Sequence, residues 1–175
     1  MRNYIPKMYQ KSVLDVNYEK LKKENIKYLL FDLDNTILEI GKDIPKKEIC
    51  TLIKKLKKDF NIYIISNNSS KKRLDKVSQC LQIPYIHFAM KPFSFGFKRI
   101  IRKHNLNKSD VCLIGDQIMT DILGGNRFGI YTVLVEPLGE KDLKVTSLNR
   151  FLEKRKLKKL EEMKLFKKGE FYEWR

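Results

Sequence analysis

Five short apolar runs recur along the chain, and stretches with helical periodicity separate them. A continuous apolar run of four to eight residues, bounded by polar residues, is typical of a strand that is buried on both faces. The predicted strands lie at the start of Tyr28–Thr36 and over Asn61–Ser66, Tyr85–Ala89, Val111–Gly115 and Ile130–Val135.

Amphipathic helices are predicted in the intervals between these strands, because apolar residues recur there every three or four positions. A helix over Tyr18–Glu24, capped by Asn17, precedes the first strand. The next helix runs from an N-cap at Asp43 to Phe60, and a third has the apolar positions Leu74, Val77 and Leu81. A fourth helix covers Ser94–His104. The last begins at Asp121, is capped by Thr120, and stops at Gly124-Gly125 or at Gly129.

Alternating strands and helices at this spacing form parallel sheets with right-handed crossovers. We therefore predict an α/β fold, a Rossmann-like three-layer sandwich whose parallel sheet has five strands or slightly more. Residues 1–16 are predicted as an arm that lies across the body. The predicted organisation is a domain over 1–146, which includes this arm, and a basic helical extension of the same domain over 147–175.

Charge is the feature of the composition that changes this picture. The chain has 37 Lys and Arg against 21 Asp and Glu, a net charge of +16. This excess predicts attraction to nucleic acid or to an acidic membrane surface without selecting between them. Residues 150–175 hold ten Lys or Arg and five Glu. They fit either a helix docked on the body or a basic element resting on anionic lipid.

Cysteine spacing and hydropathy indicate the cellular compartment. Cys50, Cys80 and Cys112 are isolated from one another, which predicts reduced thiols in the core rather than a disulfide or zinc framework. The first residues lack the apolar segment of a signal peptide, and no apolar run approaches the roughly 20 residues of a membrane span. We expect a cytoplasmic protein that is soluble or, at most, peripheral on the inner face of the membrane.

Polar side chains follow four of the predicted strands. They are Asp32 and Asp34 after the first strand, Ser66 after the second, Lys91 after the third, and Asp116 with Asp121 after the fourth. The carboxyl ends of parallel strands meet at one edge of the sheet, so these side chains can converge in one crevice. Two acids alone could belong to an ordinary polar turn, but buried carboxylates are costly without a partner, and their oxygens suit Mg²⁺.

Each of these groups has a role in phosphoryl transfer. One carboxylate can attack phosphorus and form an aspartyl-phosphate, and a second, two positions further on, can protonate the leaving oxygen and then activate water. The Ser66 hydroxyl and the Lys91 ammonium can hold the non-bridging phosphate oxygens. Asp116 completes a magnesium site with Asp32 and a backbone carbonyl.

Four segments of the chain resemble the motifs of the haloacid-dehalogenase-like (HAD) superfamily of aspartate-nucleophile phosphatases. They are Phe-Asp-Leu-Asp-Asn-Thr (31–36), Ile-Ser-Asn-Asn (65–68), Lys-Pro (91–92) and Gly-Asp-Gln-Ile-Met-Thr-Asp (115–121), in the order of the family's motifs. The resemblance implies that Asp32 is the nucleophile and Asp34 the general acid and base. It also implies that Ser66 and Lys91 bind the phosphate.

The same resemblance implies a Mg²⁺ cofactor and secondary contacts. The metal would be bound by Asp32, by Asp34 through its backbone carbonyl, and by Asp116, with Asp121 supporting the site. Thr36 and Asn67 would be secondary substrate-binding residues. Arg127 is a further candidate for holding a substrate head group.

Motif spacing leaves no room for a cap domain. Between Thr36 and Ser66 there are 29 residues, and between Ser66 and Lys91 there are 24, and the predicted elements fill both intervals. The site is therefore expected to be open to bulky phosphates. A capless chain with Thr-Asp-Ile-Leu-Gly-Gly-Asn-Arg at 120–127 resembles the class IIIA, YqeG-type branch, which includes mitochondrial phosphatidylglycerophosphate phosphatases.

This resemblance implies a phosphorylated lipid substrate, phosphatidylglycerophosphate or a similar one, at an anionic membrane surface. One alternative is a phosphatase for polynucleotide ends or phosphoproteins, and another is a basic RNA- or ribosome-associated module. Nucleic acid is the less favoured partner, because the chain shows no interleaved aromatic and basic residues for base stacking. A response-regulator-like receiver is disfavoured because Met90-Lys91 follows the third strand, where an acceptor Asp would stand. No sequence feature specifies an oligomeric state.

Overall fold

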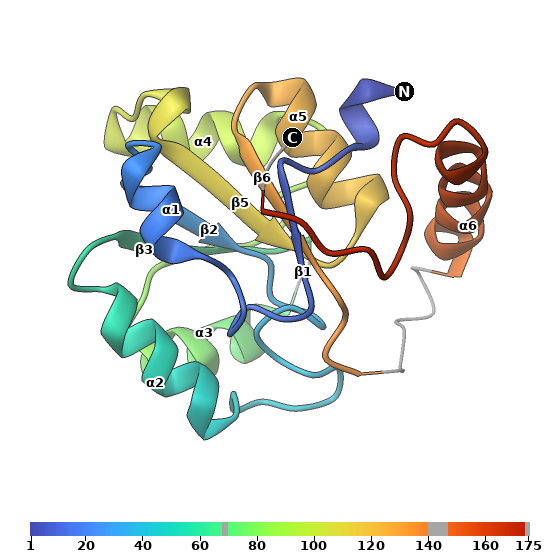
Figure 1. Cartoon of the computed structure of the whole chain (residues 1–175). Coiled ribbons are helices and arrows are strands. Elements are labelled where there is room, and N and C mark those ends of the chain that lie inside the picture. Colours follow the sequence, from blue (N-terminus) through green and yellow to red (C-terminus); the bar gives the residue numbers. More distant parts are fainter. Residues whose placement is uncertain (68–69, 140–146, 174–175) are drawn as a thin grey trace.

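The fold is built on one parallel sheet of six strands in the order β1-β6-β5-β2-β3-β4 (Figure 1). The computed structural model describes residues 1–67, 70–139 and 147–173. The strands are β1 (Met8–Gln10), β2 (Tyr28–Phe31), β3 (Asn61–Ile65), β4 (Tyr85–Ile86), β5 (Val111–Gly115) and β6 (Tyr131–Val135). The predicted parallel α/β sheet is confirmed.

Helices cover both faces of the sheet, as predicted, with α2 and α3 on one face and α4 and α5 on the other (Figure 1). The α-helices are α1 (Tyr18–Lys23), α2 (Lys47–Leu56), α3 (Lys71–Leu81), α4 (Phe95–His104), α5 (Leu123–Phe128) and α6 (Ser147–Glu162). Shorter helical turns are η1 (Arg2–Tyr4), η2 (Lys108–Asp110) and η3 (Ile118–Ile122), the last of which is π-helical.

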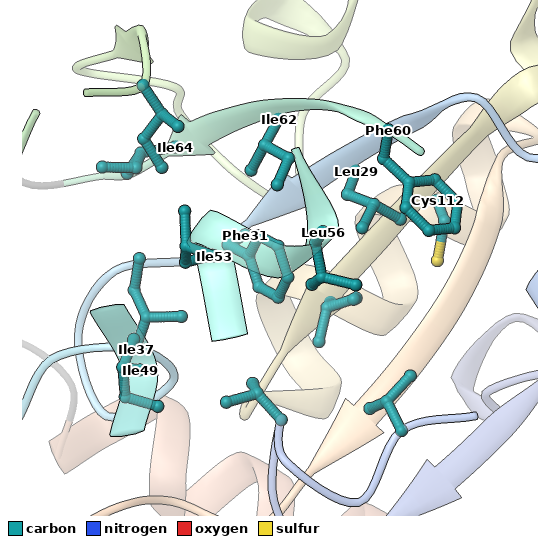
Figure 2. Close-up of a cluster of buried hydrophobic side chains, with 14 of the residues drawn as sticks. Leu29, Phe31, Ile37, Ile49, Ile53, Leu56, Phe60, Ile62, Ile64 and Cys112 are labelled. Atoms are coloured by element: carbon teal, nitrogen blue, oxygen red, sulfur yellow. The ribbon is translucent and has the colours of Figure 1, made fainter. Parts of the chain in front are cut away.

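Side chains of the central strands alternate between two apolar cores. Leu29 and Phe31 of β2 pack in the core that contains α2 and α3, which Figure 2 shows with Ile53 and Leu56 of α2. Leu30 points into the second core, which contains α4 and α5. Full burial of each such side chain contributes about 1.5–3 kcal/mol. Because both faces of β2 are buried, its polar residues can lie only beyond its end.

The N-terminal segment contributes an edge strand rather than an arm across the body. Met8 of β1 pairs in parallel with Val133 of β6, and Met8 and Tyr9 are fully buried. The backbones of Tyr9 and Tyr172 also exchange two hydrogen bonds of 2.8 and 3.0 Å. Three residues are too few to show the hydropathy pattern of a strand, so β1 can be recognised only from its pairing with sequence-distant partners.

Two predicted helix starts were wrong. Asp43 does not cap α2, which begins at Lys47, but forms an ion pair with Lys76 of α3. Thr120 does not cap a helix either, because η3 already begins at Ile118. The predicted cap at Asn17 is confirmed, since its Oδ1 accepts a hydrogen bond of 3.0 Å from the Lys20 backbone N–H.

Two further element ends differ from the prediction. The second helix ends at Leu56 and not at Phe60, and β4 ends at Ile86 rather than at position 89. Of the two predicted stops for the helix that follows Asp121, Gly129 is confirmed, since it caps α5 with φ of +84°, whereas Gly124 and Gly125 lie inside the helix. A Cβ on Gly125 would lie 2.5 Å from Thr132 Cγ2, so this glycine permits close packing and does not stop the helix.

The three cysteines are free, but they do not share the predicted core environment. Cys112 is buried, Cys50 is partly buried and Cys80 is exposed. The prediction is therefore wrong for Cys80, which lies at a position that the helical period of α3 turns outward.

The C-terminal helix α6 is docked on the body. Leu160 of α6 is fully buried in a cluster that contains Tyr9, Ile118 and Phe166. Across the described ranges, no helix combines the length and the apolar character needed to cross a bilayer. The predicted division between 146 and 147 stays a prediction, because residues 140–146 lie outside the described chain.

Candidate active site

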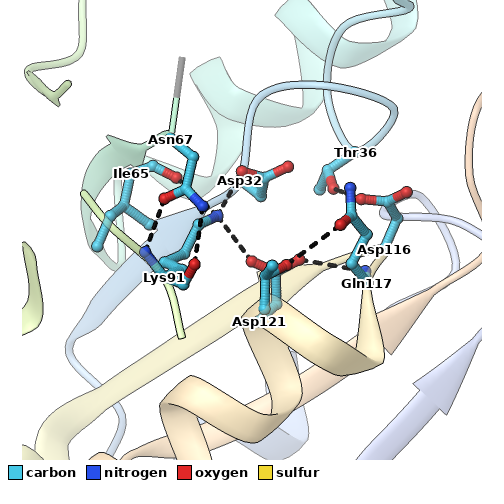
Figure 3. A network of polar contacts seen from close by, with 9 residues as sticks. Asp32, Thr36, Ile65, Asn67, Lys91, Asp116, Gln117 and Asp121 are labelled. Carbon is cyan, nitrogen blue, oxygen red and sulfur yellow. Dashed lines mark hydrogen bonds and ion pairs between the residues drawn. The ribbon is translucent and has the colours of Figure 1, made fainter. Parts of the chain in front are cut away.

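The polar residues that follow β2, β4 and β5 converge at the carboxyl edge of the sheet (Figure 3). Asp32 continues β2, and its backbone N–H donates to the Ile114 carbonyl of β5 at 2.9 Å. Asp32, Lys91 and Asp116 are all buried, as is Asp121 in η3. The strand ends and η3 therefore place four ionisable groups in one largely water-excluded cluster.

Lys91 links the elements of this cluster. Its ammonium donates to Asp32 Oδ1, to Asp121 Oδ1 at 2.7 Å and to the Ile65 carbonyl at 3.1 Å. An ammonium has three N–H donors, and each has an acceptor here. This geometry makes a buried lysine tolerable, because its charge is paired and its hydrogen bonds are complete.

Asn67 holds the backbone of the lysine loop. Its Nδ2 donates to the Lys91 carbonyl at 2.9 Å, and its Oδ1 accepts from the Lys91 backbone N–H at 2.7 Å (Figure 3). Ser66, which precedes it, is buried at the end of β3. The predicted substrate-binding residue Asn67 therefore uses its amide to join the segments that follow β3 and β4.

Three carboxylates form a candidate metal centre. One oxygen from each of Asp32, Asp116 and Asp121 lies within 4.8 Å of the other two. Hard oxygen ligands at this separation fit a divalent cation such as Mg²⁺. Thr36 Oγ1 contacts Asp116 Oδ1 at 3.5 Å, and the Gln117 backbone N–H donates to Asp121 Oδ2 at 3.1 Å.

Burial and neighbouring charges shift the pKa values of Asp32 and Lys91 in opposite directions. Burial raises the pKa of Asp32 to about 7, although the Lys91 ammonium opposes this shift. Burial alone would lower the pKa of Lys91, but Asp121 and Asp32 more than offset it and raise the pKa above its ordinary value. Lys91 is therefore a cation, and a metal ion beside Asp32 would favour the carboxylate form further.

Arg73 of α3 is a site residue that the sequence did not reveal. Its Nη1 forms an ion pair with Asp34 Oδ1, its Nε donates to the Lys42 carbonyl at 2.9 Å, and its Nη2 donates to the Glu39 carbonyl at 3.3 Å. The run Lys71-Lys72-Arg73 is typical of a solvated basic helix face. The contact between Arg73 and Asp34 could therefore not be recognised from the sequence pattern. Arg73 fixes the Asp34 carboxylate and joins the loop after β2 to α3.

Arg73→Ala is expected to lower kcat by about 10- to 100-fold, because small misplacements of a catalytic group are costly. The loss should be larger for alkyl phosphates than for p-nitrophenyl phosphate, since a poor leaving group depends more on the proton from Asp34. Steady-state kinetics with both esters checks this, with Lys72→Ala of the exposed neighbour as the control. Equal losses with both esters would contradict a role through Asp34.

Glu153 joins α6 to the cluster from a distant part of the sequence. Its buried carboxylate accepts a hydrogen bond of 2.7 Å from the Ile118 backbone N–H. Ile118 begins η3, which follows the metal-centre residue Asp116 and contains the metal-centre residue Asp121. Glu153 thus positions this loop, although the surrounding Lys/Glu-rich sequence is typical of a solvated helix.

Glu153→Ala is expected to raise the Mg²⁺ concentration for half-maximal activity several-fold, because the buried Ile118 N–H loses its acceptor at a cost of about 1–3 kcal/mol. Glu153→Gln should restore most of the affinity, since its amide oxygen can accept the same hydrogen bond. Metal titrations of activity and of thermal unfolding distinguish the variants, and the exposed Glu161→Ala is the control. An unchanged titration for Glu153→Ala would exclude this role.

The structure does not bring Arg127 to the cluster. Arg127 is exposed in the last turn of α5, and its neighbour Asn126 donates to the carbonyls of Asn3 and Ile5, which precede β1. This end of α5 therefore lies toward the amino edge of the sheet, away from Asp32. Its predicted head-group contact stays a prediction without geometric support.

A parallel α/β sheet with convergent carboxylates and a buried lysine at its carboxyl edge defines a class of enzyme, the metal-assisted phosphoryl-transfer enzymes. Residues 88–143 match the model of the HAD-hydrolase-like family. The chain is 37% identical over 158 residues to the probable phosphatase YqeG of Bacillus subtilis, covering 90% of this chain and 91% of that protein. The chain belongs to the HAD-like phosphatases.

A further relative and one solved structure are also similar to this chain. The chain is 28% identical over 153 residues to phosphatidylglycerophosphate phosphatase 1, chloroplastic/mitochondrial, of Arabidopsis thaliana, covering 79% of this chain and 42% of that protein. The fold resembles the cobalt-bound deoxy-D-mannose-octulosonate 8-phosphate phosphatase of Haemophilus influenzae, with a TM-score of 0.50 at 16% identity over 79% of this chain and 94% of that one. Among the described residues, 37–65 and 67–90 form only loops, α2, β3, α3 and β4, so neither interval holds a cap domain.

Proposed function

We propose that this phosphatase hydrolyses phosphomonoesters with Mg²⁺ through an aspartyl-phosphate on Asp32. The observation that carries the proposal is the placement of the Lys91 ammonium between Asp32 and Asp121, beside Asp116. A nucleophile, a cation for the phosphate oxygens and a cluster of oxygen ligands thus occupy one site. Asp32, Asp116 and the Asp34 carbonyl would hold the metal, with Asp121 in support, and the bound ion would neutralise charge on the phosphate.

Two carboxylates divide the chemistry in this mechanism. Asp32 attacks phosphorus, the bond from phosphorus to the ester oxygen breaks, and Asp34 gives its proton to the departing alkoxide. Water then attacks the phosphorus of the aspartyl-phosphate, Asp34 takes a proton from it, and Asp32 is released with inorganic phosphate. Lys91 and the Ser66 hydroxyl hold the non-bridging oxygens through both steps, where the negative charge is spread.

We infer that the substrate is a lipid phosphate, phosphatidylglycerophosphate or a similar molecule. Three observations support this inference: the similarity to the Arabidopsis enzyme, the lack of a cap domain in the two described intervals, and the net charge of +16. Such a charge favours contact with an anionic bilayer. We propose that the protein meets this substrate as a peripheral protein on the inner, cytoplasmic membrane face.

A substrate panel tests the proposal. Phosphatidylglycerophosphate in anionic vesicles is compared with phosphopeptides, 3′-phosphate oligonucleotides and small phosphate esters, with and without chelator. We expect the highest kcat/KM for the lipid, and loss of turnover in excess chelator. Preference for an oligonucleotide or phosphopeptide would overturn the lipid assignment and favour the corresponding alternative. Full turnover in excess chelator would overturn the metal dependence.

A further inference from the structure

The short loop beside the active site and the first residue of α4 together expose four large apolar side chains. The exposed fractions are 55% for Phe88, 45% for Met90, 69% for Phe93 and 57% for Phe95. Scattered apolar residues are common on protein surfaces, but a contiguous group of this kind marks an interaction site. The same loop carries Lys91, so this site adjoins the catalytic cluster.

The backbone of this loop is fixed by hydrogen bonds. The Ala89 N–H donates to the Ser66 carbonyl at 2.9 Å, the Phe93 N–H to the Met90 carbonyl at 2.8 Å, and the Gly96 N–H to the Ala89 carbonyl at 3.1 Å. A Cβ on Gly96 would lie 2.8 Å from Ala89 Cβ, so glycine lets the start of α4 close against the loop. The apolar side chains are thus displayed by an ordered scaffold.

Two of these residues adopt a costly conformation that keeps them outside. Phe88 and Met90 have φ values of +53° and +56°, in the left-handed region that bulky side chains rarely occupy. Ala89 between them is fully buried, so the backbone turns the small side chain inward and leaves the large ones exposed. Such strain is typical of functional segments, and here it leaves two large apolar side chains exposed beside Lys91.

A basic helix face continues from the apolar loop. Phe95 begins α4, and Lys98, Arg99 and Arg102 follow it at three, four and seven positions, which places all of them on one side of the helix. The three cations are exposed, and α4 contains no acidic residue. The combined surface, named here the α4 surface, is Phe88, Met90, Phe93 and Phe95 with Lys98, Arg99 and Arg102.

We propose that the α4 surface docks on an anionic phospholipid bilayer. The four apolar side chains enter the boundary between head groups and acyl chains, and the cations contact lipid phosphates. A second copy of the chain fits less well, because two such surfaces would bring like charges together on a protein whose net charge is +16. Docking holds Lys91 at the level of the lipid head groups. The role of docking in catalysis rests on the proposed lipid substrate.

Sedimentation with vesicles tests docking without any turnover, because phosphatidylglycerol and phosphatidylcholine contain no phosphomonoester. Wild-type protein is expected to pellet with vesicles rich in phosphatidylglycerol and to remain in solution with pure phosphatidylcholine. The double variant Phe93→Ser/Phe95→Ser should weaken partitioning at least about tenfold, because it removes two large apolar side chains. Lys98→Gln/Arg99→Gln/Arg102→Gln should weaken it similarly, and added salt should reduce wild-type binding.

Matched controls alter equivalent residues elsewhere. Ile44→Ser/Met163→Ser removes two side chains that are 70% and 48% exposed. Lys54→Gln/Lys55→Gln/Lys58→Gln removes three exposed cations from α2 and the turn that follows it. Both controls should bind vesicles as the wild type does. All variants should turn over p-nitrophenyl phosphate normally, which verifies their fold and site.

Three results would overturn docking. Wild-type protein could fail to pellet with the anionic vesicles, or the two α4-surface variants could pellet like their controls. Sedimentation velocity could also show a wild-type dimer that Phe93→Ser/Phe95→Ser converts to a monomer, which would make the surface a contact between copies. A different preferred substrate in the panel leaves vesicle binding unchanged, so failure of the lipid assignment and failure of docking are distinguishable.

Discussion

Asp32→Asn is expected to lower phosphatase turnover by at least about 10⁴-fold, the scale of loss seen when a covalent nucleophile is removed. The amide has the shape of the carboxylate but cannot form the acyl-phosphate. Acid quench of the wild-type enzyme with labelled substrate should trap phosphate on the protein, and the variant should trap none. Circular dichroism should show that the variant keeps its fold.

Asp59→Asn provides the control for this result. Asp59 is exposed and precedes β3, so it lies toward the amino edge of the sheet, opposite the site. Its replacement removes the same charge and should leave turnover unchanged. Retention of more than a few per cent of activity by Asp32→Asn would exclude the covalent mechanism.

Lys91→Met is expected to impair both stability and catalysis. Removing one partner from a buried charge pair costs about 3–5 kcal/mol, because the remaining carboxylates lose their compensating cation. Loss of the cation that holds the phosphate oxygens should lower kcat by about 10²- to 10³-fold. Thermal unfolding and steady-state kinetics measure the two effects separately.

Mg²⁺ should partly restore the stability of Lys91→Met, because a bound cation can replace the missing charge among Asp32, Asp116 and Asp121. The increase in Tm on adding Mg²⁺ should therefore be larger for the variant than for the wild type. Lys103→Met, which alters an exposed lysine of α4, should behave as the wild type does. Equal increases in Tm would show that the metal and Lys91 do not share these carboxylates.

The central sheet could be predicted from sequence because its determinants are local. Apolar runs such as Val111–Gly115 are typical of strands buried on both faces, and helical intervals between them require a parallel arrangement. Strand β1 could not be predicted in the same way, and for β4 the start could be predicted but not the end. The first exists through pairing with β6, and the second ends where Phe88 and Met90 adopt positive φ values, which no local pattern of bulky residues indicates.

The active site shows the same division between local and distant determinants. Asp32, Lys91 and Asp116 follow directly from their positions after strands, and the structure brings them together as predicted. Arg73 and Glu153 reach the site through contacts that span 39 and 35 positions of sequence. In each case the neighbouring sequence is rich in charge, so the sequence pattern does not distinguish a charged residue that contacts the site from one on a solvated surface.

The edge strand β1 has a consequence for folding during synthesis. Met8 leaves the ribosome early, yet its partner Val133 and the Tyr172 backbone that borders Tyr9 are made much later. Domains generally condense once their sequence-distant contacts can form. We therefore expect the backbone of β1 to remain unpaired on the nascent chain until β6 and the segment after α6 emerge. Until then the side chains of Met8 and Tyr9, which are fully buried in the folded protein, should be exposed and accessible to chaperones. Since Glu153 also arrives late, the metal-binding loop should reach its final position only then, and a partly synthesised chain should bind metal poorly.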